Sequence, residues 1–352
     1  MRIAIVNDMV MALEGLRRVV LSTGLHEIAW TAMCGKEAIE YCASDLPDLI
    51  LMDIIMPEMN GVETTRLIMQ LTPCPILVVT SSVNKNSALV FEAMGNGALD
   101  AVNTPVLMGS HTAGDQESLL RKISMLSVLT QPRTKDDRGI SLTAVEKSCH
   151  KQGVELVAIG ASSGGPQALA TVLRNLPVNY SPAVVIVQHV DVQFSQGLAD
   201  WLDQQSKLPV RLAKQGDRPM PGQVLLAGSN DHLVLTENGD FRYTADPESV
   251  PYRPSIDVFW DSLNKYWKGK LTAILLTGMG RDGAKSMLEL RHGGARTIAQ
   301  DEESCAVFGM PKAAIAINAA SEIRSVEEIA EILIGSEFLM KTGQTSSKGL
   351  GI

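Results

Sequence analysis

The sequence has few of the features that mark secreted, zinc-bound or membrane proteins. Its five cysteines form an odd number, and no two of them stand in a CxxC pair. This argues against a disulfide framework and a structural zinc site, and it fits a reducing compartment, so we expect a cytoplasmic protein. No apolar run approaches the ~18 residues that cross a bilayer. The N-terminal MRIAIVNDM turns polar too early for a signal peptide, so we expect neither secretion nor direct membrane insertion.

Positive charge is also scarce. The 31 lysines and arginines are outnumbered by 39 acidic residues, which leaves a formal net charge of −8. A nucleic-acid-binding surface needs clustered basic residues, so we expect no nucleic-acid partner. Hydrophobic residues at 45% and charged residues at 20% are ordinary for a globular chain, and 352 residues predict two or three domains.

The first third of the chain alternates short apolar runs with helical patterns. Between the runs, apolar residues recur three and four positions apart, as in amphipathic helices. Five strands alternating with helices predict a flavodoxin-like, doubly wound, five-stranded parallel sheet over residues 1–125. The predicted strands are residues 2–6, 27–32, 48–53, 75–80 and 98–102.

Residues 126–152 interrupt this alternation with polar sequence that contains proline and glycine, and we interpret them as an interdomain linker. The alternative is a surface excursion within one large domain. Strand–helix alternation then resumes and predicts a larger, doubly wound, mostly parallel α/β domain over residues 153–342. Within it, short runs split by Gly, Pro and Asn-Gly predict inserted antiparallel hairpins over residues 209–245. Residues 343–352 are a predicted disordered tail.

Two aspartates follow predicted strands of the first domain. Asp8 comes after RIAIVN, and Asp53 ends LILMD, so both lie at the carboxyl ends of parallel strands, where α/β sheets place their sites. Two carboxylates meeting there repel each other unless a cation such as Mg²⁺ bridges them, and a metal-held aspartate can accept a phosphoryl group. Thr80 ends another strand, within reach of the same crevice. The alternative is that both aspartates only cap helices.

A second motif, GASSGG at residues 160–165, joins an apolar run to a predicted helix. A phosphate-binding loop of the Walker type needs a lysine that is absent here, and the dinucleotide pattern GxGxxG fails at Ser162. The pattern that fits is GxSxG, in which a serine occupies a tight turn. We therefore expect Ser162 to be a nucleophile, and such a serine needs a base and an orienting acid.

Strand ends also supply those two partners. His189 follows the strand AVVIVQ, and Asp282 lies in the glycine-rich TGMGRDGA after the strand LTAILL, so both are predicted to meet Ser162 at one sheet edge. His232 and His292 lack comparable placement. The order Ser…His…Asp differs from that of α/β-hydrolases, but the geometry of a triad does not depend on order.

The segment LILMDIIMPEMNG resembles the acceptor segment of response-regulator receiver domains, and the resemblance covers about residues 1–125. It implies that Asp53 is the phosphoacceptor, that Asp8 and Asp53 hold Mg²⁺, and that Thr80 is the switch hydroxyl.

Three positions depart from the receiver pattern. Asn7 stands where many receivers have a second acid, which removes one charge from the metal site. Thr104 replaces the usual lysine, which removes a charge-assisted contact to the phosphoryl group. Ala101 replaces the usual aromatic residue. We expect phosphorylation to persist and its coupling to a conformational switch to be weaker.

The segments GASSGGPQAL, VIVQH, LLTGMGRDGA and QDEESCAVFGMP resemble the catalytic domain of the chemotaxis protein-glutamate methylesterases, the CheB family, over about residues 153–340. RPSID at 253–257 matches a further segment of that family. Receiver domains precede the catalytic domain in these enzymes, so the resemblance covers nearly the whole chain.

This resemblance implies a role for each predicted site residue. Ser162 would be the nucleophile, His189 the general base and then acid, and Asp282 the group that orients the imidazole. The backbone amides of Ser163 and Met279 would form the oxyanion hole. No cofactor is implied for the esterase.

The resemblance also implies substrates and partners. Glutamate γ-methyl esters on the cytoplasmic helices of a methyl-accepting chemoreceptor would be hydrolysed, and glutamines could be deamidated by the same chemistry. A CheA-type histidine kinase would be the phosphodonor.

The receiver segments VNDM, TPCPILVVT and VFEAMGNGALDAVNTP resemble the Wsp-type branch, which serves surface sensing. Two alternatives are a lipase-like hydrolase of small esters and a non-catalytic response regulator whose output domain binds a partner.

Overall fold

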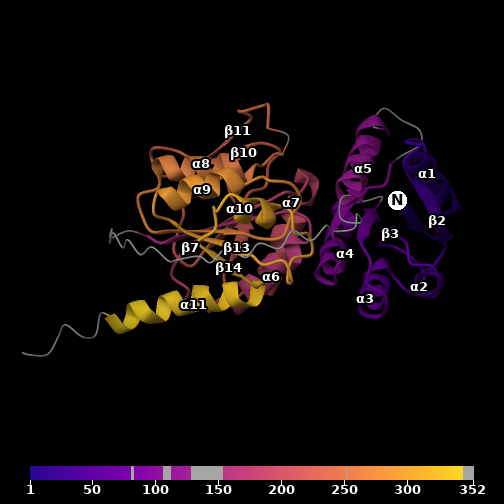
Figure 1. The fold of residues 1–352 in the computed structure, drawn as a ribbon, viewed down its shortest axis with the longest axis horizontal. Coiled ribbons are helices and arrows are strands. Elements are labelled where there is room, and N and C mark those ends of the chain that lie inside the picture. Colours follow the sequence, from indigo (N-terminus) through magenta and orange to yellow (C-terminus); the bar gives the residue numbers. More distant parts are fainter. Residues whose placement is uncertain (81–82, 106–111, 128–153, 251, 344–352) are drawn as a thin grey trace, which may run out of the picture. The chain divides into compact units, whose positions relative to one another are not determined.

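The computed structural model describes residues 1–80, 83–105, 112–127, 154–250 and 252–343. These residues form two compact units, Met1–Ile140 and Ser141–Ile352, which we call the N-terminal and C-terminal units (Figure 1). Residues 128–152 of the predicted linker and 344–352 of the predicted tail lie outside the described residues.

The N-terminal unit is built on a five-stranded sheet in which every strand pair is parallel. The strands, in the order in which they lie across the sheet, are β2 (Glu27–Ala32), β1 (Arg2–Val6), β3 (Leu49–Asp53), β4 (Ile76–Thr80) and β5 (Asp100–Asn103). Their apolar residues are buried because helices cover both faces. The doubly wound fold predicted from the apolar runs is therefore confirmed.

The helices of this unit divide between the two faces of the sheet. On one face α1 contacts α5, and on the other α2, α3 and α4 pack in sequence. Their bounds are α1 (Val10–Leu21), α2 (Gly35–Ser44), α3 (Gly61–Leu71), α4 (Val83–Gly95) and α5 (Thr112–Ser127). The last helix extends two residues beyond the predicted domain boundary at 125.

The C-terminal unit contains a seven-stranded sheet whose strands also pair in parallel. Its order across the sheet is β14 (Glu322–Arg324), β13 (Arg296–Gln300), β12 (Leu271–Leu275), β6 (Leu156–Ala161), β7 (Ala183–Gln188), β9 (Val224–Leu226) and β8 (Val210–Leu212). Because β6 is central and lies between β12 and β7, the loops that follow these three strands meet at one edge.

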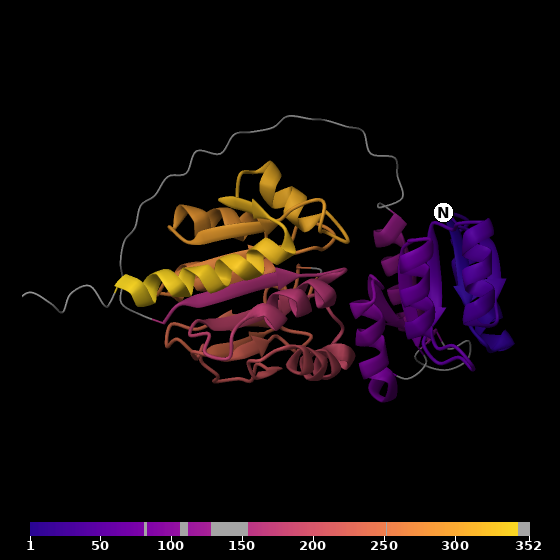
Figure 2. The ribbon, with the colours of Figure 1, turned by 90° about the horizontal axis from the view of Figure 1, so that it is seen from below.

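Helices again cover both faces of this sheet. One face carries α6, α7 and α11, and the other carries α8, α9 and α10 (Figure 1). Figure 2 shows α11 running along the unit beside α6. Their bounds are α6 (Gly165–Asn175), α7 (Val192–Gln205), α8 (Ile256–Tyr266), α9 (Ala284–His292), α10 (Met310–Ala316) and α11 (Val326–Gly343). Among the described residues, no helix is both long and apolar enough to cross a bilayer.

The antiparallel hairpins predicted over residues 209–245 are only partly correct. One hairpin is present, formed by β10 (His232–Leu235) and β11 (Phe241–Thr244). The earlier strands β8 and β9 instead join the main sheet in parallel. The chain between β8 and β9 returns to the amino ends of the strands through a loop that contains no helix. Strands of three residues such as VRL and VLL carry no signal that separates a parallel strand from a hairpin arm.

Candidate active site

The predicted nucleophile lies in the loop between β6 and α6. The Ser162 amide donates to the carbonyl of Thr277 at 3.0 Å, and the Ser162 carbonyl accepts from the Gly165 amide at 2.7 Å. The side-chain amide of Gln188 donates to the same carbonyl at 2.8 Å. Ser162 is 5% exposed. The serine is thus held by its own turn, by the end of β7 and by the loop after β12.

Two glycines allow this tight arrangement. Gly164 adopts φ +76°, in the left-handed region that side chains other than glycine disfavour, and a methyl group there would lie 2.5 Å from Ala306 Cβ. A methyl group on Gly278 would lie 2.6 Å from Ser162 Cβ. The GxSxG pattern and the glycine-rich loop after β12 therefore describe two backbone segments in close contact.

The predicted base and acid are in direct contact. Nε2 of His189 lies 2.7 Å from Oδ2 of Asp282, and the two side chains are 8% and 6% exposed. The other ring nitrogen, Nδ1, is buried and has no hydrogen-bond partner among the described residues. In this ring orientation Asp282 holds Nε2, which leaves Nδ1 as the nitrogen that can take up a proton.

The carboxylate of Asp282 is held by the N-terminus of α8. It accepts from the amides of Ile256 at 2.7 Å and Asp257 at 3.1 Å, and from the hydroxyl of Ser255 at 2.8 Å. Burial opposes its ionisation, but the bond and charge of His189, together with these amides, lower the pKa of Asp282 below its ordinary value. The acid is therefore charged and fixed in orientation.

Two residues behind this acid were not predicted from the sequence. Ser255 caps α8 by accepting from the Val258 amide, and its own amide donates to Nδ1 of the fully buried His232 at 3.2 Å. Burial lowers the pKa of His232, which favours the neutral ring that can accept this bond. A serine directly before an apolar helical pattern is a sequence signal for a helix N-cap. Its second bond, to Asp282, depends on packing that no local pattern reveals.

The two segments predicted to supply the oxyanion hole lie side by side. Thr277 donates from its hydroxyl to the Ser163 carbonyl at 3.0 Å, and the carbonyl of Gly278 accepts from the Met310 amide at 2.8 Å. These contacts hold the carbonyl of Ser163 and that of Gly278, the residue before Met279, so both amides belong to hydrogen-bonded loops at the same sheet edge as Ser162.

In the N-terminal unit, Asp53 ends β3 beside Asn7 and Asp8. The Asn7 side-chain amide donates to Oδ2 of Asp53 at 2.9 Å, while its Oδ1 accepts from the Met9 amide at 2.9 Å. Burial raises the pKa of Asp53 to about 6, and the charge of Asp8 adds to this rise. Asn7, which stands where the receiver pattern leads us to expect a second acid, thus contacts Asp53 as a hydrogen-bond donor.

These groups fit a divalent cation. A hard cation between Asp8 and Asp53 would offset the repulsion and burial that raise the pKa of Asp53. The described residues contain no group of three or more His, Cys, Asp or Glu side chains placed to hold a metal. The two carboxylates would therefore be the charged ligands, with carbonyls and water completing the shell. The hydroxyl of Thr80, fully buried at the end of β4, accepts from the side-chain amide of Asn86 at 3.4 Å.

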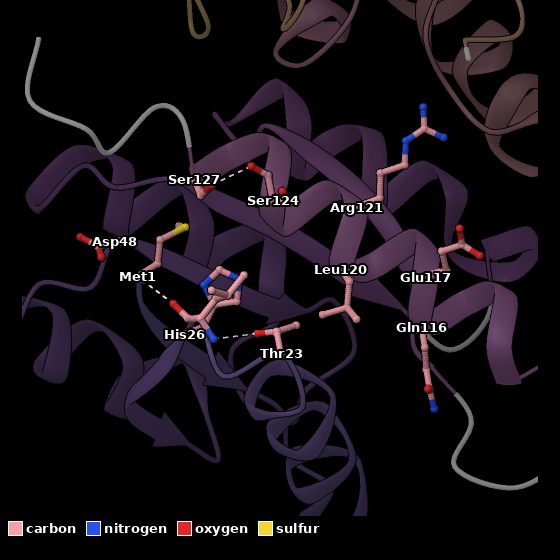
Figure 3. A pocket seen from close by; sticks show the side chains of 11 residues that line it. Met1, Thr23, His26, Asp48, Gln116, Glu117, Leu120, Arg121, Ser124 and Ser127 are labelled. Carbon is pink, nitrogen blue, oxygen red and sulfur yellow. Dashed lines mark hydrogen bonds between the residues drawn. The ribbon is translucent and has the colours of Figure 1, made fainter. Parts of the chain in front are cut away.

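A hollow of about 900 Å³ lies elsewhere on the N-terminal unit, between α5 and the loop that leads into β2 (Figure 3). Met1 and Asp48 line it just before β1 and β3, so it opens at the amino ends of the strands, opposite Asp53. None of the predicted site residues contributes to its wall. Its lining residues are Met1, Thr23, Leu25, His26, Asp48, Gln116, Glu117, Leu120, Arg121, Ser124 and Ser127.

Comparison with known proteins identifies both units. Residues 157–333 match the family described as CheB methylesterase, and residues 3–110 match the response regulator receiver domain. A protein of Pseudomonas aeruginosa named protein-glutamate methylesterase/protein-glutamine glutaminase 3 is 53% identical over 330 residues, which are 94% of this chain and 98% of that protein. A Pseudomonas putida protein named protein-glutamate methylesterase/protein-glutamine glutaminase of group 3 operon is 52% identical over 342 residues, which are 97% of this chain and 100% of that protein.

Among solved structures, the CheB methylesterase catalytic domain of Thermotoga maritima matches with 37% identity and a TM-score of 0.50. The match covers 52% of this chain and 98% of that domain. These similarities leave the lipase-like and the non-catalytic alternatives without support.

Proposed function

Because the chain belongs to the family of CheB methylesterases that carry a response-regulator receiver domain, it is a protein-glutamate methylesterase and glutaminase, and we propose that Ser162, His189 and Asp282 carry out the hydrolysis. The observation that carries this proposal is the 2.7 Å contact between His189 and Asp282, at the sheet edge that also holds the Ser162 loop. The substrates are glutamate γ-methyl esters on the cytoplasmic helices of chemoreceptors, so the enzyme works in the cytoplasm.

These positions support the following reaction. Ser162 Oγ attacks the ester carbonyl while the ring nitrogen of His189 that Asp282 does not hold takes the serine proton. The charge of Asp282 stabilises the imidazolium that forms. The backbone amides of Ser163 and Met279 hold the tetrahedral oxyanion, a contribution of about 3–4 kcal/mol per donor.

Acylation and deacylation then follow, each with its own proton transfers through His189. His189 returns its proton to the leaving methoxide, methanol departs, and the glutamyl acyl group stays on Ser162. Water enters, gives a proton to His189 and attacks the acyl carbon. His189 then passes that proton to Ser162 Oγ as the bond to the acyl carbon breaks, which releases a free glutamate and restores the serine hydroxyl. A glutamine side chain passes through the same acyl-enzyme with ammonia as the leaving group, which accounts for the glutaminase activity.

Regulation is proposed to come from the N-terminal unit. A CheA-type histidine kinase donates a phosphoryl group to Asp53, and Asp8 and Asp53 hold the Mg²⁺ whose charge neutralises the incoming phosphate. Thr80 responds to the phosphoryl group, and the unphosphorylated unit restricts access to the esterase. With Thr104 in place of lysine, the phosphoryl group lacks one charge-assisted contact, so the shift toward the open state is smaller than in relatives that carry the lysine.

The pathway is proposed to be of the Wsp type. This rests on the resemblance of the receiver segments, and in such a pathway the kinase has a second target that makes a cyclic dinucleotide. Deleting the gene is expected to change cyclic-dinucleotide levels on surfaces. Unchanged levels together with altered swimming would instead place the enzyme in a motility pathway.

Methanol release from methylated receptor membranes tests the catalytic proposal. The Ser162→Ala variant is expected to release no methanol and to unfold at the same temperature as the parent. The matched control is Thr171→Ala, which removes an exposed hydroxyl from α6, the helix that follows Ser162. It is expected to keep full activity. Methanol release by Ser162→Ala at the parent rate would show that another group is the nucleophile.

A further inference from the structure

The ring of Tyr252 lies flat on the imidazole of His189. The two ring centroids are 4.6 Å apart and the ring planes differ by 4°. Tyr252 belongs to the segment that leads into Ser255 and α8, far along the chain from β7, which ends just before His189. The stack therefore joins two segments of the C-terminal unit that are distant in sequence but adjacent in the folded chain.

With this stack, one edge and one face of the imidazole have known neighbours. Asp282 holds the Nε2 edge at 2.7 Å, and Tyr252 covers one face. The side chain of His189 is 8% exposed, so little of the ring meets solvent. An imidazole held at one edge can still rock about its Nε2 bond. A parallel ring whose centroid lies 4.6 Å away restricts that motion.

Tyr252 also reaches the loop that carries Met279. A methyl group added at Gly280 would lie 3.5 Å from the Tyr252 hydroxyl oxygen, so the phenol extends from the imidazole to the backbone of that loop. One half-buried side chain thus contacts His189 and approaches the segment that supplies a proposed oxyanion donor. Its position is suited to fixing the geometry between these two groups.

We propose that Tyr252 is a positioning residue for the esterase reaction, which holds the His189 ring in its working plane and stabilises the imidazolium. This inference rests on the proposed role of His189. The face of an aromatic ring is negative, so it attracts the imidazolium more strongly than the neutral imidazole. Because the imidazolium forms only as Ser162 loses its proton, the stack strengthens during the reaction and raises kcat rather than substrate binding.

Substitutions at Tyr252 separate this role from simple space filling. Tyr252→Phe keeps an aromatic face over His189. Tyr252→Leu fills part of the volume with an apolar side chain but has no aromatic face, and Tyr252→Met does so with a more flexible one. If only burial matters, all three variants behave alike. If the aromatic face matters, the phenylalanine variant stands apart from the other two.

The matched control is Tyr266→Leu. Tyr266 is the last residue of α8, whereas Tyr252 lies just before its first turn. Because α8 has eleven residues with a rise of 1.5 Å each, Tyr266 lies about 16 Å along the helix axis from the start of α8. The same chemical change is therefore made in the same unit without contact to His189, and kcat is expected to stay at the parent value.

The experiment measures kcat and KM for methanol release from methylated receptor membranes by the full chain and each variant, with thermal unfolding alongside. Tyr252→Leu and Tyr252→Met are expected to lower kcat about tenfold, which corresponds to 1.4 kcal/mol, with KM within about twofold. Tyr252→Phe is expected to stay within about twofold in both.

Two results would overturn the inference. One is a kcat within twofold of the parent in both aliphatic variants. The other is an equal loss in Tyr252→Phe, which would assign the effect to the hydroxyl. If Ser162→Ala abolishes the parent activity in the same assay, the proposed function is supported independently. Either of the two results above then counts only against the inference about Tyr252.

Discussion

At the scale of single residues, the site is organised around Asp282. Its two carboxylate oxygens accept four hydrogen bonds, from His189, Ser255 and the first two amides of α8. A buried carboxylate is unfavourable unless its oxygens are satisfied, and here the helix N-terminus and the imidazole together satisfy them. The same bonds that stabilise the charge also point one oxygen at the ring that is proposed to carry the proton.

Removing one of these bonds tests how far orientation of the acid matters. Ser255→Ala takes away the hydroxyl bond to Asp282 and the cap of α8. We expect a stability loss of about 1–2 kcal/mol and a tenfold lower kcat for methanol release. Ser325→Ala, which removes a cap hydroxyl that accepts from the Glu328 amide at the start of α11, should lose stability with kcat unchanged. Equal kcat values for the two variants would contradict an orienting role for Ser255.

The raised pKa of Asp53, the proposed phosphoacceptor, predicts that the stability of the N-terminal unit depends on pH. The pKa of Asp53 is raised from its ordinary 3.8 to about 6 by burial, so the folded unit binds the proton more tightly than the unfolded chain. Its contribution to stability is complete below pH 4 and is lost as the pH rises through 6. In buffer with EDTA, Asp53→Asn should therefore unfold at a higher temperature than the parent at pH 8. The gap should close toward pH 4, and a gap that is independent of pH would contradict the assignment.

The sequence located some residues of the site and missed others for a physical reason. Ser162, His189 and Asp282 each follow a parallel strand, and parallel topology alone places such loops at one edge. Ser255, His232 and Tyr252 reach the same place from the start of a helix, from a hairpin and from an irregular segment. Their approach depends on how α8 packs on the sheet. The placement of sites at the carboxyl ends of parallel strands does not describe that packing. The catalytic roles of the three predicted residues stay predictions until they are measured.

At the scale of elements, the turn between β6 and α6 depends on one backbone conformation. Gly164 stands at φ +76°, and a methyl group there would also press on Ala306. Gly164→Ala is expected to destabilise the C-terminal unit by about 1–2 kcal/mol from backbone strain, with a further loss from the contact. Displacement of the Ser162 loop should lower kcat as well. Thermal unfolding and methanol release measure both effects, and an unchanged unfolding temperature would contradict the strained turn.

The elements themselves were predictable to different degrees. The strands of the N-terminal unit begin within two residues of the predicted positions because long apolar runs between amphipathic helices carry a strong signal. The pairing of β8 and β9 was not predictable because their order and direction depend on partners distant in sequence, β7 above all. Local alternation indicates a strand, whereas the neighbour with which it pairs is decided by the whole sheet.

At the scale of the whole molecule, one chain joins a phosphorylatable unit to an esterase. The proposed control predicts that residues 150–352 alone release methanol faster than the full chain without phosphodonor. A small phosphodonor with Mg²⁺ should raise the full-chain rate and leave the fragment unchanged, and Asp53→Asn should abolish the response. Because Thr104 replaces the usual lysine, we expect the rise to be smaller than in lysine-bearing relatives. Equal rates for the fragment and the unphosphorylated full chain would mean that the N-terminal unit does not inhibit.

The most direct test of the account is whether His189 and Asp282 activate Ser162. A fluorophosphonate reacts with a serine hydroxyl only when a neighbouring base takes its proton, so its labelling rate reports this activation without a receptor substrate. We predict a single adduct, mapped by mass spectrometry to Ser162 and formed at least a hundredfold more slowly in His189→Ala and Asp282→Ala. An adduct on a different residue, or labelling of Ser162 at the parent rate in both variants, would contradict it.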